Sequence, residues 1–170
     1  MGDLFVRWFV WIEGLGFSTW VRESGSLLAF PALLFLHTLG IALVAGGAAI
    51  VCFALLGLWP KGSPIGPLER LFPVIWAGFW LEIVTGVSMF MKDASSYGRN
   101  PDLYWKLLFI AVAMGLLAVL RRRVFRDAAV DTRPVPRQAR LMAGGVLVCW
   151  LAVIVTGRLL AYLNPLPVFF

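Results

Sequence analysis

The stretch that decides the fold is SLLAFPALLFLHTLGIALVAGGAAIVCFALLGL, residues 26–58, which contains no Lys, Arg, Asp or Glu. A helix of about 20 apolar residues crosses a bilayer, so this stretch is long enough to span one with residues to spare. It carries His37, the single histidine of the chain. Because an ionisable side chain at membrane depth is costly, His37 marks a candidate functional site.

The composition of the whole chain agrees with this interpretation. Of its 170 residues, 61% are hydrophobic and 14% are charged, and the mean hydropathy is +0.87. Soluble domains are about 45–50% apolar and about 25% charged. The sequence therefore predicts an integral membrane protein with one domain, residues 1–170. The net charge of +6 comes mainly from arginines in one loop between apolar runs, which is a topological pattern and predicts no nucleic-acid partner.

Four apolar runs predict the architecture. The expected spans are residues 27–58, 71–91, 104–120 and 141–163. Residues 3–23 are aromatic and amphipathic but too short in their apolar part to span, so they predict one interfacial helix or two short ones broken at Gly14 and Gly16. The predicted fold is all-α, an integral membrane four-helix bundle with an N-terminal amphipathic interfacial helix, and the lipid bilayer is its first partner.

The arginines also predict an orientation. Residues 121–140 hold seven arginines, and with Lys61 and Arg70 they place nine cations on one side of the membrane against five on the other. The positive-inside rule puts the loops 59–70 and 121–140 in the cytoplasm. We therefore expect a bacterial inner-membrane protein with both termini on the periplasmic side.

Glu82 is the second ionisable candidate within a span. Gly78, Glu82 and Gly86 are four residues apart, so they share one helix face. A carboxylate on a glycine-lined face is expected to point at a neighbouring helix and to pair with a cation, here Arg158 or Lys106. This predicts a buried polar cluster of Glu82 and Arg158.

Four candidate residues lie at similar distances from the outer ends of their spans. At 1.5 Å per residue, His37 lies about 15 Å from the outer end of its span, and Glu82 about 14 Å. Met114 lies about 12 Å deep, and Arg158 about 8 Å. We therefore expect these side chains to meet in the outer half of the bundle.

Several segments resemble a family of small bacterial four-helix integral membrane proteins of unknown function. The resemblance runs through WVRESGSLLAFPALLFLHTLGIALVAGG, FPVIWAGFWLEIVTGVSMF, NPDLYWKLLF and VTGRLLAYL. Its firmest features are His37 with Gly40, Thr85 with Gly86, Lys106, and Gly157 with Arg158. The His-xx-Gly span is more distantly similar to the membrane domain of copper-resistance D proteins. Cys52 stands where relatives tend to have an acidic residue. The resemblance implies the fold, but no reaction.

The leading functional hypothesis is a buried haem b or other redox site, in an electron-transfer or redox-associated subunit. Four-helix bundles hold haem through inward-facing His or Met side chains. His37 would be one axial ligand and Met114 the other, with Met89 as second choice, or His37 would come from two protomers. Lys106 or Arg158 would pair with the propionates.

Three alternatives stay open. The first is a non-catalytic accessory or scaffold subunit, in which His37, Glu82 and Arg158 form a structural polar cluster and other membrane subunits or a second copy bind alongside. The second is copper handling with His37 and Met114 as ligands, because imidazole and thioether suit copper. The third is a proton path through His37 and Glu82. No phosphate loop, nucleophile elbow or HExxH motif is present, so no catalytic residue is predicted.

Overall fold

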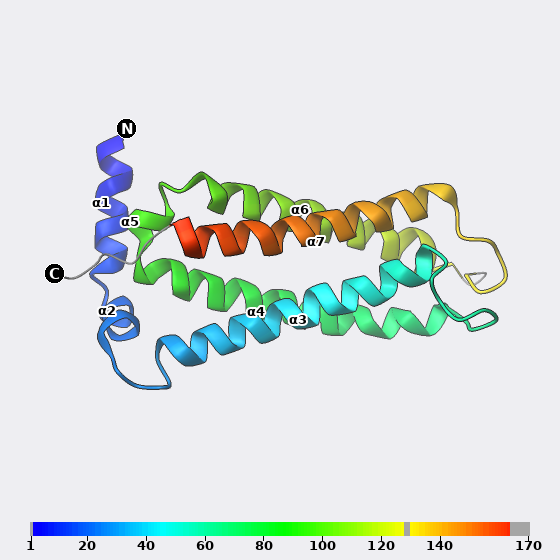
Figure 1. Cartoon of the computed structure of the whole chain (residues 1–170), viewed down its shortest axis with the longest axis horizontal. Coiled ribbons are helices and arrows are strands. Elements are labelled where there is room, and N and C mark those ends of the chain that lie inside the picture. The colour runs from blue at the N-terminus through cyan, green and yellow to red at the C-terminus, as the bar shows by residue number, and fades with distance from the viewer. Residues whose placement is uncertain (1, 128–129, 164–170) are drawn as a thin grey trace.

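The computed structural model describes residues 2–127 and 130–163, and within these ranges it contains helices and no strand. Four helices are long and apolar enough to cross a membrane, which confirms the expected number of candidate spans. They are α3 (Phe30–Leu55), α4 (Leu71–Lys92), α6 (Pro101–Leu120) and α7 (Arg137–Leu163) (Figure 1). Their bounds lie within a few residues of those expected from the apolar runs.

The four long helices form two pairs. Helix α3 packs along α4, and α6 packs along α7, while the contact between the pairs runs mainly through α3 and α7 (Figure 1). The long helices run side by side, so the molecule has two ends. We call the end with residues 56–70 and 121–136 the loop end, and the end with the N-terminal helices the terminal end.

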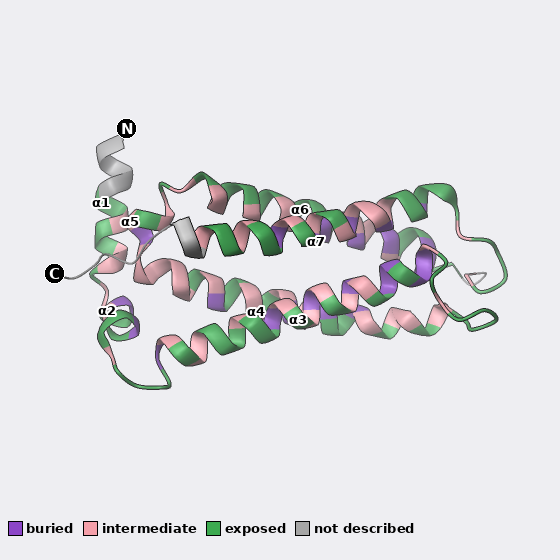
Figure 2. Cartoon of the chain, in the orientation of Figure 1, coloured by how far each residue is buried: buried purple, intermediate pink, exposed green. Residues whose placement is uncertain are grey.

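The apolar core belongs to the loop end and the middle of the bundle. Apolar side chains from all four long helices and from residues 124–125 make it: Val44, Ala48, Val51, Cys52, Leu55, Phe72, Ile75, Ala113, Met114, Leu117, Leu120, Val124, Phe125, Ala139, Ala143, Val146, Trp150 and Val153. Among the described residues, α3 contributes nothing to this core before Ile41, and α4 nothing after Phe79. Figure 2 shows the same asymmetry, with buried residues of the long helices gathered toward the loop end. The two pairs are therefore packed firmly together over only part of their length.

Glycines bring the backbones of α3 and α4 into contact at the level where the apolar core ends. A Cβ added to Gly78 would lie 2.8 Å from the Cβ of Leu43 and 3.1 Å from the carbonyl oxygen of Gly40. A Cβ added to Gly40 would lie 3.2 Å from the backbone nitrogen of Glu82. Because neither position has room for a side chain, the two backbones approach closely at the level where His37 and Glu82 emerge.

Three short helices close the terminal end: α1 (Gly2–Glu13), α2 (Gly16–Glu23) and α5 (Ala94–Tyr97). The break between α1 and α2 falls at the predicted glycines. Helix α1 lies across the end of the bundle and not along it (Figure 1). Its Phe9 ring packs edge-on against Phe90, with ring centroids 6.0 Å apart, and Glu13 accepts a hydrogen bond from the backbone N–H of Ser95.

The loop end contains two short helical elements. A 3₁₀ helix, η1 (Gly66–Arg70), leads into α4, and a π-helical turn, η2 (Arg121–Phe125), extends α6. The carboxylate of Asp131 accepts hydrogen bonds from the backbone N–H groups of Ile65 and Gly66, at 2.7 and 2.9 Å. These bonds tie the two loops together, so the proline- and glycine-rich segment is ordered by a distant side chain.

Candidate functional site

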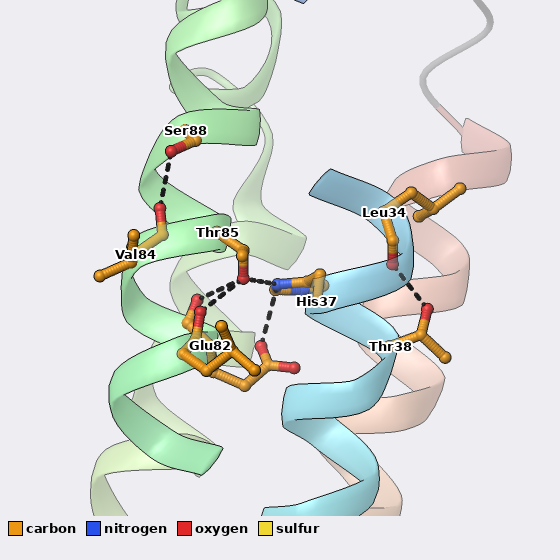
Figure 3. Close-up of polar contacts among 8 residues, drawn as sticks. Leu34, His37, Thr38, Glu82, Val84, Thr85 and Ser88 are labelled. Atoms are coloured by element: carbon orange, nitrogen blue, oxygen red, sulfur yellow. Dashed lines mark hydrogen bonds and ion pairs between the residues drawn. The ribbon is translucent and has the colours of Figure 1, made fainter. Parts of the chain in front are cut away.

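His37 lies on the side of α3 that faces α4. Its Nδ1 atom is 2.9 Å from the Oγ1 of Thr85 and 3.2 Å from the Oε2 of Glu82 (Figure 3). Thr85 is buried, and the side chains of His37 and Glu82 are only 16% and 10% exposed. One ring nitrogen of the histidine therefore has two oxygen partners in a largely buried setting between two helices.

The contacts of the Thr85 hydroxyl favour one tautomer of His37. Its Oγ1 donates a hydrogen bond to the carbonyl oxygen of Leu81 at 2.6 Å. A hydroxyl has one proton to donate, so toward His37 it acts as an acceptor. The Glu82 carboxylate is an acceptor as well. With two acceptors at Nδ1, that atom carries the proton, and Nε2 of the neutral ring keeps its lone pair.

The second ring nitrogen remains free for another partner. Among the described residues, no hydrogen bond reaches His37 Nε2, and this atom is not one of the fully buried polar atoms without a partner. It therefore keeps some accessible surface. A Cβ added to Gly86 would lie 3.4 Å from the Cε1 of His37, so a glycine at this position gives the imidazole ring its space.

Glu82 has one satisfied and one unsatisfied oxygen. Its Oε2 contacts His37, whereas its Oε1 is fully buried with no hydrogen-bond partner among the described residues. Lys106 of α6 is the cation expected to pair with Glu82, but among the described residues the two form no ion pair. The Lys106 ammonium lies beside Gly157 of α7, where an added Cβ would be 3.8 Å from Nζ.

The structure joins some of the predicted site residues and separates others. His37 and Glu82 are in contact, whereas Lys106 forms no ion pair with Glu82 among the described residues. Arg158 is exposed, and among the described residues it forms no ion pair with Glu82. Met114 is 5% exposed and belongs to the apolar core, of which His37 is not a member. The polar cluster in contact therefore comprises His37, Glu82 and Thr85, in a different combination from the predicted one.

Thr85 is the site residue that sequence analysis left without a role. It follows Glu82 by three residues, so a helix places both on one face. Its hydroxyl is one of few polar groups in this span. A threonine in an apolar helix usually bonds only to its own backbone, and the sequence does not show that His37 would approach it.

Within residues 2–127 and 130–163, no group of three or more His, Cys, Asp or Glu side chains is placed to hold a metal ion. The chain matches no protein-family model, and no curated protein and no solved structure is significantly similar to it. The chemistry of the His37 cluster is therefore the basis for a functional assignment.

Proposed function

We propose that this chain is a small redox-associated membrane protein that holds haem b through Nε2 of His37. The observation that carries the proposal is the pair of acceptors on Nδ1, Glu82 and Thr85, which leaves a lone pair on Nε2. Histidine ligands in proteins commonly donate their other ring N–H to a carboxylate or another oxygen, which fixes the ring and raises its basicity.

Haem, a flat apolar group with acidic edges, would lie at the terminal end of the bundle beside His37. Among the described residues, the apolar core ends before the level of His37 on α3 and α4. Lys106 and Arg158 belong to the same end and would serve as partners for the propionates. When bound, haem supplies a centre that gains and loses one electron.

The chain's own residues would hold and tune that group. Glu82 and Thr85 keep the imidazole in one tautomer and one orientation. Met114 lies in the core, so it would supply a thioether only after the core rearranges, and His37 of a second copy of the chain is the other candidate for a second ligand.

A second candidate function is that of an accessory membrane subunit without a cofactor. It is favoured by the hydrogen bonds of the cluster, because His37, Thr85 and Glu82 link α3 to α4 without any added ligand. In that case the cluster stabilises the helix pair and the exposed apolar surface receives other subunits.

We also propose the membrane placement that the arginines suggest, in a bacterial inner membrane with the loop end in the cytoplasm. Helix α1 would lie in the outer interface, since Trp8 and Trp11 are 59% and 60% exposed on a helix that crosses the end of the bundle. Trypsin tests this orientation. It should cleave the 121–140 loop in inverted vesicles and leave it intact in spheroplasts, and the reverse result would overturn the placement.

An absorption spectrum tests the haem proposal. Protein purified from cells that receive ample haem precursor should show a Soret band, and His37→Ala should abolish it. Thr38→Ala is the matched control, because Thr38 is next to His37 but bonds to its own helix at Leu34 (Figure 3). Added imidazole should restore the band to folded His37→Ala protein. A colourless wild-type protein from haem-supplied cells would overturn the proposal and favour the accessory subunit.

A further inference from the structure

The loop end presents a surface of arginine side chains. Three helix ends contribute to it: the start of α4, the extension of α6 and the first turn of α7. Its exposed members, which we call the arginine face, are Arg70, Arg122, Arg123, Arg126, Arg137 and Arg140. Because they flank the ends of the candidate spans, these side chains lie at the level where a bilayer has its headgroups.

The acidic side chains of the loop end do not neutralise this face. Segments 59–70 and 121–140 hold nine Lys and Arg but only three acids. Glu69 lies 3.5 Å from Arg121, and Asp127 lies 3.7 Å from Arg133. The third, Asp131, accepts two backbone N–H groups. Each acid thus has a partner outside the arginine face, whose members form no ion pair among the described residues.

The same contacts hold the arginine face in place. The Phe72 ring of α4 packs edge-on against Phe125 of η2, with centroids 5.3 Å apart. The Arg121 guanidinium lies over the Phe72 ring at 5.5 Å. Together with the Asp131 bonds, these contacts fix η2 against α4. The arginines of η2 therefore start from an ordered backbone, which lowers the entropy lost when they bind a ligand.

We propose that the arginine face binds the phosphate groups of anionic phospholipids. A guanidinium forms paired hydrogen bonds with phosphate oxygens, and basic residues at a membrane surface are attracted to anionic lipid. A lipid headgroup is the phosphate source that the geometry favours, because the arginines stand at the ends of helices that would be embedded in that lipid. The proposal depends on membrane insertion and is independent of haem binding.

Thermal unfolding in reconstituted vesicles tests this binding. The full chain is placed in vesicles of phosphatidylcholine alone, or of phosphatidylcholine and phosphatidylglycerol in equal parts, and unfolding is followed by tryptophan fluorescence. We expect a higher Tm in the anionic vesicles, and the double variant R122Q/R123Q should lose at least half of that increase. The control R7Q/R99Q removes the same charge from exposed side chains at the terminal end and should keep the increase.

Two further arms distinguish the source of the phosphate and the kind of contact. R122K/R123K keeps the charge without the paired geometry, and we expect a Tm increase between those of the wild type and of R122Q/R123Q. Inorganic phosphate added to phosphatidylcholine vesicles should leave Tm unchanged. The proposal is overturned if free phosphate reproduces the anionic-lipid effect, if the two vesicle types give the same Tm, or if the control loses the increase as R122Q/R123Q does.

Discussion

The Oε2 atom of Glu82 lies 3.2 Å from the Nδ1 atom of His37, across the contact between α4 and α3. This relationship connects two ionisable side chains that are 45 positions apart in the sequence. It favours a proton on Nδ1 of His37 and a lone pair on Nε2. It also makes the α3–α4 contact the part of the bundle where substitutions are most informative.

Removing the Thr85 hydroxyl should weaken the His37 cluster. Thr85→Val keeps the shape but loses both the bond to His37 and the bond to Leu81. We expect the free energy of unfolding in detergent micelles to fall by about 1 kcal/mol. Thr85→Ser keeps the hydroxyl and should stay close to wild type. Equal stability of the valine and serine variants would show that the hydroxyl contributes nothing to this contact.

Adding a methyl group to Gly78 should force α3 and α4 apart. Its Cβ would lie 2.8 Å from the Cβ of Leu43, which a helix backbone holds in place. We expect Gly78→Ala to lower the free energy of unfolding by about 1–3 kcal/mol, the usual cost of overpacking. The measurement is a denaturant titration in micelles.

Gly46→Ala is the matched control for this substitution. An added Cβ at Gly46 of α3 meets nothing within 4 Å. Alanine favours helix over glycine by up to about 1 kcal/mol, so the variant should be neutral or more stable. If both alanine variants behaved alike, close backbone approach at Gly78 would not be the reason for its glycine.

Asp131 should control the order of the loop that precedes α4. In Asp131→Ala the backbone N–H groups of Ile65 and Gly66 lose their shared acceptor. We expect the amide hydrogens of Ile65 and Gly66 to exchange several-fold faster, as measured by mass spectrometry. Asp131→Asn retains a side-chain oxygen and should show a smaller increase. Unchanged exchange in the alanine variant would mean that the two loops are held by other contacts.

Phe9 should anchor α1 to the end of the bundle. Its ring packs against Phe90 and fills the space that Gly98 leaves, since a Cβ there would lie 2.6 Å from the ring. Phe9→Ala should release α1 and speed amide exchange across residues 7–13. Trp8→Ala removes an exposed ring of similar size and is the control. Faster exchange in both variants to the same extent would contradict a specific role for Phe9.

Local signals in the sequence were enough to locate the long helices. Apolar runs predicted the four candidate spans, because burial or lipid contact along a helix requires unbroken apolar sequence. At the start of α6, the side chain of Asn100 caps the helix before Pro101 by accepting the N–H of Asp102 at 2.9 Å. The π-helical turn at Arg121–Phe125 was not predicted, since its residues have no local pattern that distinguishes it from an ordinary loop.

The sequence by itself determined that the chain is helical, how many helices could span a membrane, and that His37 and Glu82 are costly residues within them. Only the tertiary structure decided which side chains meet. Depth along a helix can be counted from the sequence, but rotation about the helix axis and the choice of neighbouring helix depend on packing. The close approach of Gly40 and Gly78 sets that rotation for α3 and α4. As a result, His37 contacts Glu82 and Thr85. The separate pairing of α6 with α7 leaves Met114 in the core and Arg158 exposed, because each helix turns its own apolar side toward its partner.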